Sequence, residues 1–122
     1  MATTSTITSF DGAALKAAIE GRDAAALLDL HADDAELELV DRENTPSSPL
    51  KLKGRAALGE AFEDIYGREM THSVGPVLVD GDHVAWVVRC RYPDGTRVLC
   101  IAAAEVRDGR IVRETGVQAW DA

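Results

Sequence analysis

Three Asp-Gly pairs divide the second half of this chain into four apolar runs of similar length. Glycine reaches positive φ without steric cost and aspartate tolerates it, so Asp-Gly between apolar runs is the strongest short-range signal for a β-hairpin. The pairs are Asp80-Gly81, Asp94-Gly95 and Asp108-Gly109. We therefore predict four antiparallel strands, which at this length form a strongly twisted sheet. Their expected ranges are Thr71 to Val79, His83 to Tyr92, Thr96 to Arg107 and Arg110 to Trp120.

Three amphipathic segments before these strands have helical spacing. From Phe10 to Glu20 the apolar residues fall on one helical face, and Gly21 stands where a left-handed C-cap is favoured. Asp23 is a good N-cap for a second helix, which Ala32-Asp33-Asp34-Ala35 is expected to end. From Arg55 to Tyr66 apolar residues recur at i, i+3, i+4 and i+7, which predicts a third helix.

The segment between the second and third predicted helices begins as a strand. Residues 36–41 start as a polar and apolar alternation, which puts Leu37, Leu39 and Asp41 on one inner face. Residues 42–50 include two prolines and read as a loop that could form the rim of a pocket. No predicted helix follows the last strand, so the helices must cover one face of the sheet. The predicted fold is an α+β open cone with an apolar cavity.

The size and charge of the chain limit its organisation and its partners. A length of 122 residues suits one domain, and we expect 1–8 to be a flexible segment and 9–122 to be that domain. The formal net charge of -8 repels phosphate backbones and anionic lipid, which argues against nucleic acid and membranes as partners. The sequence has no signal-peptide pattern and no stretch long enough to span a membrane, which favours a cytoplasmic location.

Short motifs at the junctions between elements carry a family resemblance. They are Gly-Arg-Asp-Ala at 21–24, Ala-Asp-Asp-Ala at 32–35, Lys-Gly-Arg at 53–55 and Asp-Gly-Arg-Ile-Val at 108–112. In this order the chain resembles, over about residues 8 to 120, the nuclear transport factor 2-like superfamily, and more narrowly its SnoaL-like polyketide cyclase and ketosteroid isomerase branch. The resemblance implies a cone of three N-terminal helices packed on a strongly curved, mainly antiparallel sheet. Enzymes, ligand binders and dimerisation domains share these motifs, so they indicate the fold more strongly than an activity.

The resemblance carries over few of the catalytic residues of ketosteroid isomerase. The tyrosine that donates to the oxyanion falls at about Leu15, and the acidic donor falls at about Ala102. The catalytic base lies on the first strand, where the nearest carboxylate of the same facing is Asp41. Without either oxyanion donor, steroid isomerisation would lack its main stabilising interaction, so that specific activity is not expected. The Asp-Arg-Asp network of limonene epoxide hydrolase-like enzymes has no clear counterpart here either.

Four residues are the candidates for acid/base chemistry: Asp41, Tyr66, His72 and Glu114. Desolvation at the mouth of an apolar cone would raise the pKa of Asp41, which suits a general base, and an exposed strand-end aspartate is the alternative. His72 or Tyr66 would donate protons, unless they are a hydrogen-bonded structural histidine and a core tyrosine. An inward-facing Glu114 would need a function or a cationic partner, because burying it unpaired is costly, and a solvated edge position is the alternative.

Side chains on the same inner faces are expected to hold the substrate, although a one-residue slip in register would reverse the faces. The predicted substrate-binding residues are Phe62, Trp86, Cys90, Gln118 and Trp120. His31 reads as the C-terminal cap of the second helix. No two histidines share metal-ligand spacing with a carboxylate, so we expect neither a metal nor another cofactor.

The cysteines Cys90 and Cys100 flank one predicted turn. In neither hairpin register are they directly opposed, so we expect buried thiols rather than a disulfide. A Cys90 or Cys100 nucleophile paired with His72 is a further alternative, disfavoured because nothing in the sequence lowers the pKa of either thiol.

The function expected from these features is that of a small cofactor-independent enzyme. It would perform cyclisation or isomerisation by general acid/base catalysis on a hydrophobic, enolisable small molecule. The first alternative is a non-catalytic ligand-binding or dimerisation module with Asp41 and Glu114 in solvent, and the second is epoxide hydrolase-like hydrolysis by a water held between two carboxylates. We expect a homodimer through the sheet, because the outer face carries apolar residues among its charges. They are Val87, Ile101, Ala103 and Val117.

Overall fold

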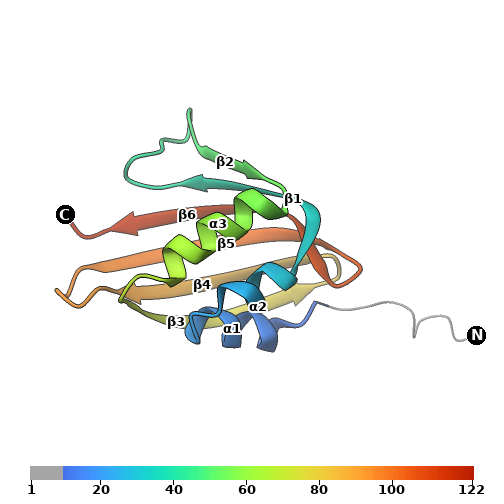
Figure 1. Cartoon of the computed structure of the whole chain (residues 1–122), viewed down its shortest axis with the longest axis horizontal. Helices are drawn as coiled ribbons and strands as arrows, with labels where there is room; N and C mark the ends of the chain where they lie inside the picture. The colour runs from blue at the N-terminus through green and yellow to red at the C-terminus, as the bar shows by residue number, and fades with distance from the viewer. Residues whose placement is uncertain (1–9) are drawn as a thin grey trace, which may run out of the picture.

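The computed structural model describes residues 10–122, so the expected flexible segment 1–8 lies outside the described residues. Within residues 10–122 the chain forms three helices and six strands, which Figure 1 shows as one sheet with helices packed on it. The helices are α1 (Gly12–Glu20), α2 (Ala24–Asp29) and α3 (Arg55–Tyr66). The strands are β1 (His31–Val40), β2 (Leu50–Lys53), β3 (Thr71–Asp80), β4 (His83–Arg91), β5 (Arg97–Arg107) and β6 (Arg110–Trp120).

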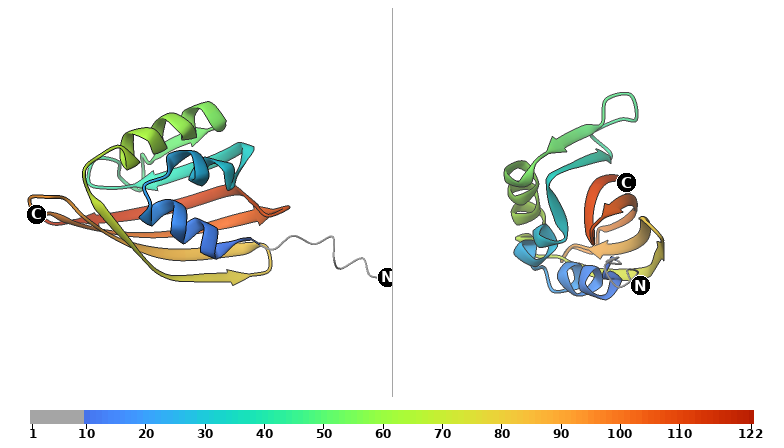
Figure 2. Two further views of the ribbon diagram at one scale, coloured as in Figure 1. Left: turned by 60° about the horizontal axis from the view of Figure 1, so that its bottom comes forward. Right: turned by 90° about the vertical axis from the view of Figure 1, so that its right-hand side faces the viewer.

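The six strands form a single curved sheet in the order β2-β1-β6-β5-β4-β3. The pairing of β1 with β6 is parallel, and the other four pairings are antiparallel. In the right-hand view of Figure 2 the sheet is strongly curved, and the helices lie on its concave side. The α+β class and the curved, mainly antiparallel sheet are therefore confirmed.

The four-stranded meander follows the Asp-Gly pattern closely. Each end of β3 to β6 lies within one residue of its predicted position. The turn glycines Gly81, Gly95 and Gly109 have positive φ, and Asp108 also adopts a φ of 54°. The hairpins form where predicted because the turn residues themselves supply the required backbone conformation.

Two features around β1 differ from expectation. The segment Ala32–Ala35 does not end a helix, because α2 stops at Asp29 and the chain enters β1, where His31 pairs with Ile111 of β6. The predicted loop 42–50 is confirmed up to residue 49, but the strand β2 that follows it and pairs with β1 was not predicted. Helix α3 follows β1 and β2, so only α1 and α2 precede the whole sheet, although all three helices precede the four-stranded meander. The two differences concern pairing between distant segments, which local propensity does not encode.

The junction between α1 and α2 differs from its expected form in one residue. Asp11 and Asp23 cap the two helices, each accepting a hydrogen bond from a backbone N–H three residues later at 3.0 Å. Gly21 is right-handed with φ of -81°, so the expected left-handed glycine is wrong. Arg22 adopts the left-handed conformation instead, with φ of 54°, and its Nε donates to the Tyr66 carbonyl oxygen at 3.1 Å. The side chain of Arg22 thereby ties this turn to the end of α3.

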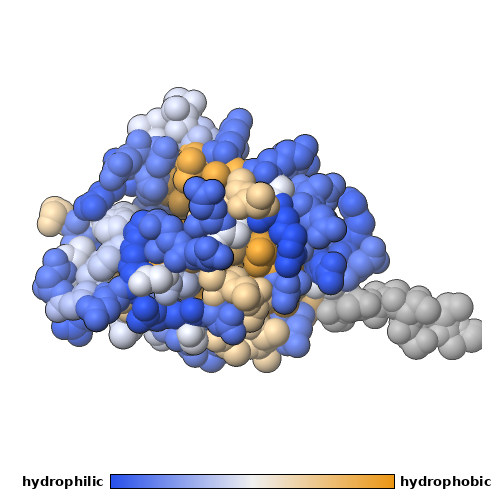
Figure 3. Space-filling model, in the orientation of Figure 1, coloured by the Kyte–Doolittle hydropathy of each residue, from blue (hydrophilic) through white to orange (hydrophobic). Residues whose placement is uncertain are grey.

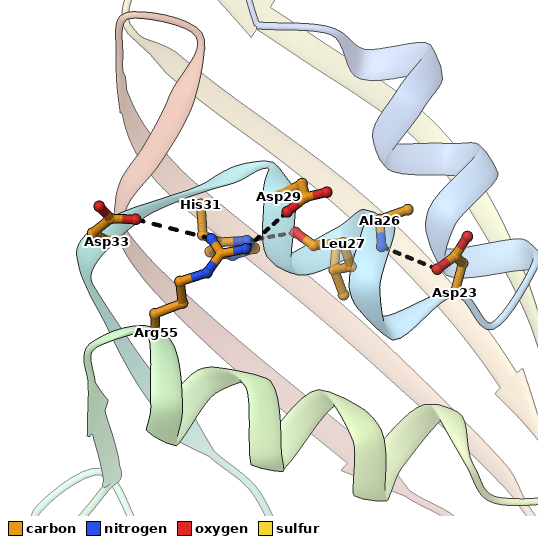
Figure 4. Close-up of polar contacts among 7 residues, drawn as sticks. All are labelled: Asp23, Ala26, Leu27, Asp29, His31, Asp33 and Arg55. Carbon is orange, nitrogen blue, oxygen red and sulfur yellow. Dashed lines mark hydrogen bonds and ion pairs between the residues drawn. The ribbon is translucent and has the colours of Figure 1, made fainter.

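Helix α3 begins at a glycine whose conformation no other residue adopts easily. Gly54 has φ of 90° and ψ of 160°, and its N–H donates to the Ala35 carbonyl oxygen at 2.9 Å. Figure 4 shows the next residue, Arg55, reaching across to the segment around α2, where it contacts Asp29 at 2.8 Å and Asp33 at 4.0 Å. These contacts fix the start of α3 above the sheet.

The core lies between the helices and the concave face of the sheet. Leu15, Leu58 and Ile111 are fully buried there, one from each of α1, α3 and β6. The surface on the helical side is largely hydrophilic, with a few apolar areas (Figure 3). The apolar faces of the helices therefore point inward, as their spacing predicts.

Candidate functional site

A cavity of about 890 Å³ occupies the space between the helices and the concave sheet. Inward-facing side chains line it in rows that run across neighbouring strands. Nearest the end of β6 the row is His72, Cys90, Val98 and Trp120, followed by Val88, Cys100 and Gln118. All nine residues expected to form the site line this cavity: Asp41, Phe62, Tyr66, His72, Trp86, Cys90, Glu114, Gln118 and Trp120.

At its inner end the cavity contains a histidine and a glutamate in contact. His31 Nε2 lies 3.4 Å from Glu114 Oε1, and the side chains are 2% and 15% exposed. His31 Nδ1 lies 2.8 Å from the Leu27 carbonyl oxygen, a contact that Figure 4 shows at the end of α2. The ring also packs against Phe62, with centroids 5.1 Å apart. Glu114 thus faces inward and has the partner that its burial requires.

The contacts of His31 limit where the proton between the two side chains can lie. The Leu27 carbonyl only accepts, so Nδ1 of His31 must carry a hydrogen and donate it. A hydrogen bond between Nε2 and Glu114 then needs one more proton, on the imidazole or on the carboxyl group. With that proton, His31 and Glu114 would share one exchangeable hydrogen beside the cavity.

A second cluster lines the same cavity on β3 and β4, toward the other edge of the sheet. His72 Nδ1 is 3.2 Å from Cys90 Sγ, and the Tyr66 and His72 rings have centroids 5.0 Å apart. His72 is 9% exposed, and its Nε2 is buried without a hydrogen-bond partner among residues 10–122. Burial, reinforced by the charge of Glu114, raises the pKa of Tyr66, so its hydroxyl stays protonated and can donate to a ligand.

The thiols of Cys90 and Cys100 face the same cavity on neighbouring strands. Cys90 pairs with Val98 and Cys100 pairs with Val88, so the two are diagonal neighbours and both are free, as expected. Hydrogen bonding with the Cys100 thiol and with His72 lowers the pKa of Cys90, although burial raises it. The expectation that nothing nearby lowers a thiol pKa is therefore wrong.

Aromatic and polar side chains surround the mouth of the cavity. Trp120 stacks on Tyr92 with centroids 5.7 Å apart, and the Arg42 guanidinium lies 4.1 Å from the Trp120 ring centroid. Trp120 Nε1 donates to Gln118 Oε1 at 3.0 Å, which fixes both side chains. Arg42 and Tyr92 were not predicted as site residues, since one lies in a loop and the other beside a turn.

Asp41 lies at the rim, in a role different from the expected one. Its Oδ1 accepts hydrogen bonds from Glu43 N and Asn44 N at 2.8 Å and from Asn44 Nδ2 at 3.0 Å. Burial alone would raise the pKa of Asp41, but these hydrogen bonds and the charge of Arg42 outweigh it and lower the pKa. The expected rise in pKa is wrong, because the carboxylate holds the turn after β1.

The two oxyanion-donor positions of ketosteroid isomerase hold apolar residues here. Leu15 is fully buried on α1, and Ala102 lies in the cavity wall on β5. The proton-bearing groups of this cavity come from other positions. The sequence predicted His31 only as the C-terminal cap of the second helix, a contact that it makes through Leu27. Its contact with Glu114 was missed, although an inward-facing Glu114 was expected to need a partner.

Within residues 10–122 no group of three or more His, Cys, Asp or Glu side chains is arranged to hold a metal ion. The same residues contain no helix long and apolar enough to cross a membrane.

Comparison with solved structures supports the fold assignment. A protein from Kribbella flavida, provisionally assigned as a ketosteroid isomerase, is 24% identical with a TM-score of 0.72, over 90% of this chain and 74% of that one. An NTF2-like protein of unknown function from Mesorhizobium loti is 24% identical with a TM-score of 0.75, over 86% and 84%. A computationally designed 17-OHP binder is 20% identical with a TM-score of 0.64, over 89% and 94%. At these identities the likeness concerns the fold alone.

A search of curated proteins finds no match to this chain. The family of SnoaL-like domains matches residues 13–114, which include α1 to α3 and most of the sheet. The chain therefore belongs to the SnoaL-like domain family.

Proposed function

We propose that this protein is a small cofactor-independent enzyme that moves protons on a hydrophobic, enolisable small molecule, in a reaction of the isomerisation or cyclisation type. The observation that carries the proposal is the contact between His31 and Glu114 inside an apolar cavity. In such a pair the carboxylate of Glu114 can take a proton from a carbon acid. The His31 imidazole beside it stabilises the charge of the carboxyl group before and after this transfer.

Glu114 replaces Asp41 as the general base in this proposal. Its side chain is 15% exposed and faces the cavity, and His31 holds one of its oxygens. Asp41 has its Oδ1 engaged by three hydrogen bonds at the rim, and its lowered pKa makes it a weaker base. A structural role at the mouth suits Asp41 better.

Two donors face the same space and could stabilise an enolate oxygen. The Tyr66 hydroxyl stays protonated because its pKa is raised, and the charge of Glu114 contributes to this rise, so the two groups act on one region. His72 also lines the cavity, and its Nε2 is buried without a partner among the described residues. A donor aimed at the developing oxyanion is the usual source of stabilisation in enolisation.

The walls favour a flat, apolar ligand. Phe62 and Trp86 flank the interior, and Trp120 with Tyr92 forms an aromatic wall at the mouth. A volume of about 890 Å³ lies within the range of small-molecule sites. The fold of the designed 17-OHP binder supports a small-molecule ligand for a cavity of this kind.

The two alternative functions have less support. A purely passive module requires Glu114 in solvent, whereas its side chain is mostly buried beside His31. Hydrolysis by a water between two carboxylates requires Asp41 close to Glu114. Asp41 follows Val40, which pairs with Val117, so the two carboxyl groups are about four residues, or roughly 13 Å, apart along β6.

The proposal includes a homodimer formed through the outer face of the sheet. Val40, Val117, Ile101 and Val87 are paired neighbours across four strands on that face. Ile101 is 54% exposed and Val117 is 50% exposed, which leaves a continuous apolar row in water. A second copy would cover this row symmetrically.

The enolisation step can be tested without knowing the natural substrate. The bicyclic ketone 2-tetralone in D₂O should exchange its α-hydrogens faster with the protein than without it, as measured by NMR. Binding of the ketone is followed separately by quenching of the Trp86 and Trp120 fluorescence. A ketone that binds without any acceleration of exchange would contradict the proposal.

A further inference from the structure

We propose that Cys90 and His72 form a nucleophilic pair that captures α,β-unsaturated carbonyl compounds covalently in the cavity. This chemistry is distinct from the proton transfer assigned to Glu114. Its reacting atom is the Cys90 sulfur, and it shares His72 with the donors proposed for the enolate.

His72 contacts the Cys90 thiol with one ring nitrogen and has its other ring nitrogen unpartnered among residues 10–122. Its Nδ1 lies 3.2 Å from Cys90 Sγ, which is hydrogen-bond distance for sulfur. When the Cys90 thiol donates to Nδ1, or has passed its proton to Nδ1, the ring carries a hydrogen on Nε2. That Nε2 is buried and has no partner among residues 10–122, and His72 is one of the residues that line the cavity. Cys90 thus has a base in His72 Nδ1, and the unpartnered His72 Nε2 could donate to a polar atom of a ligand.

The surroundings favour the thiolate form of Cys90. Cys100 on β5 and His72 on β3 flank it, and together they lower its pKa in spite of burial. The Tyr66 ring from α3 covers His72 and supplies a second donor nearby. Charge on the Cys90 sulfur is thus supported from the two neighbouring strands, β3 and β5.

The reaction balances without an oxidant or a leaving group. The Cys90 proton moves to His72 Nδ1, and the sulfur forms a C–S bond to the β-carbon of the enone. The electron pair of the C=C bond moves through the conjugated system to the carbonyl oxygen. His72 Nε2 then gives its hydrogen to that oxygen, and the enol tautomerises to the ketone. The product is a thioether adduct that contains every atom of the ligand.

The test uses 2-cyclohexen-1-one as the probe and intact-mass spectrometry as the readout. We expect one adduct per chain, located on Cys90 by peptide mapping, which forms faster on the native protein than on the protein unfolded in urea. Cys90→Ser should abolish the adduct, and Cys100→Ser should keep it on Cys90. His72→Gln should slow its formation by about tenfold or more, because the thiol loses its base.

Ser73→Ala is the matched control, since Ser73 is the exposed neighbour of His72 on the same strand, and its rate should equal that of the unsubstituted protein. Circular dichroism of each variant checks that it folds. If a variant does not fold, the ratio of native to unfolded rates in the unsubstituted protein decides the question.

Three results would overturn the inference: modification of both thiols only after unfolding, an adduct on Cys100 in the native protein, or a His72→Gln variant that reacts as fast as the original. None of these results depends on Glu114. The role of Glu114 is tested separately by hydrogen exchange of 2-tetralone, a ketone that has no enone group to react with Cys90. Failure of the covalent capture and failure of the proposed enolisation are therefore distinguishable.

Discussion

His31 and Glu114 are 83 residues apart in the chain, yet Nε2 of the one lies 3.4 Å from Oε1 of the other. The contact exists because β1 follows α2 and runs parallel to β6, where His31 pairs with Ile111, three residues before Glu114. Both side chains then point into the space under α3. This relationship is the basis of the first two predictions.

Glu114→Gln should slow α-hydrogen exchange of 2-tetralone by about 100-fold or more, because the amide cannot accept a proton as a base does. NMR of the ketone in D₂O measures the rate. The control is Glu105→Gln, since Glu105 lies on the neighbouring strand with its side chain 53% exposed and contacts Arg113. Equal loss of rate in the two variants would speak against a specific role for Glu114.

The pair should also be coupled in stability. His31→Ala removes a fully buried ring and leaves Glu114 without its partner, so we expect the free energy of unfolding to fall by about 2–4 kcal/mol. A double-mutant cycle with Glu114→Ala should give a coupling of roughly 1–3 kcal/mol by urea denaturation. Additive effects would show that the two side chains do not interact in the folded protein.

Asp41→Asn should leave α-hydrogen exchange largely intact, since Asp41 stabilises the turn after β1 rather than acting as the base. Asp41→Ala should lower the free energy of unfolding by about 1 kcal/mol, because it removes the acceptor of three hydrogen bonds. Exchange rates and urea midpoints of the two variants provide the check. Loss of exchange in Asp41→Asn, with the fold retained, would restore Asp41 as the base.

The pKa of Asp41 also makes a prediction about pH. Its folded pKa is below its usual value of 3.8, so its carboxylate contributes stability above that value and loses the contribution as the pH falls through the folded pKa. The difference in urea midpoint between the unsubstituted protein and Asp41→Asn should therefore shrink when the pH is taken below about 4. A difference that stays constant across this range would contradict the assigned cause.

Ile101→Lys should disrupt the proposed homodimer and give a monomer, because it places a charge in the middle of the apolar row on the outer face of the sheet. Light scattering after size-exclusion chromatography measures the mass. Ile101→Val keeps the row apolar and should leave the dimer intact. A single-chain mass for the unsubstituted protein would refute the proposed dimer at once.

Gly54→Ala should lower the free energy of unfolding by about 1–3 kcal/mol. The cost is conformational, since φ is 90° there and a Cβ would meet no atom within 4 Å. Gly81→Asn is the comparison, because its φ of 59° lies where asparagine is tolerated and the space around it is also open. Thermal or urea unfolding of both variants separates backbone strain from steric contact.

Local rules account for the parts of the fold that were predicted correctly. The Asp-Gly turns, the apolar spacing of α3 and the alternation in β4 to β6 each depend on a few neighbouring residues, so the chain encodes them directly. The inward facing of Trp86, Cys90, Glu114 and Trp120 followed from the same alternation once the turns were located. The start of β1 and the existence of β2 depend on partners far along the chain, and there the prediction failed.

By itself the sequence determined the family, the helices, the meander and the set of side chains on its inner face, because these follow from short-range backbone preferences and periodicity. Only the tertiary structure decided which of those side chains meet. It joined His31 to Glu114 and His72 to Cys90, and it engaged Asp41 in a turn. The reason is physical: proton sharing and pKa depend on distances of a few ångströms, and curvature of the sheet sets those distances between residues that the sequence keeps far apart.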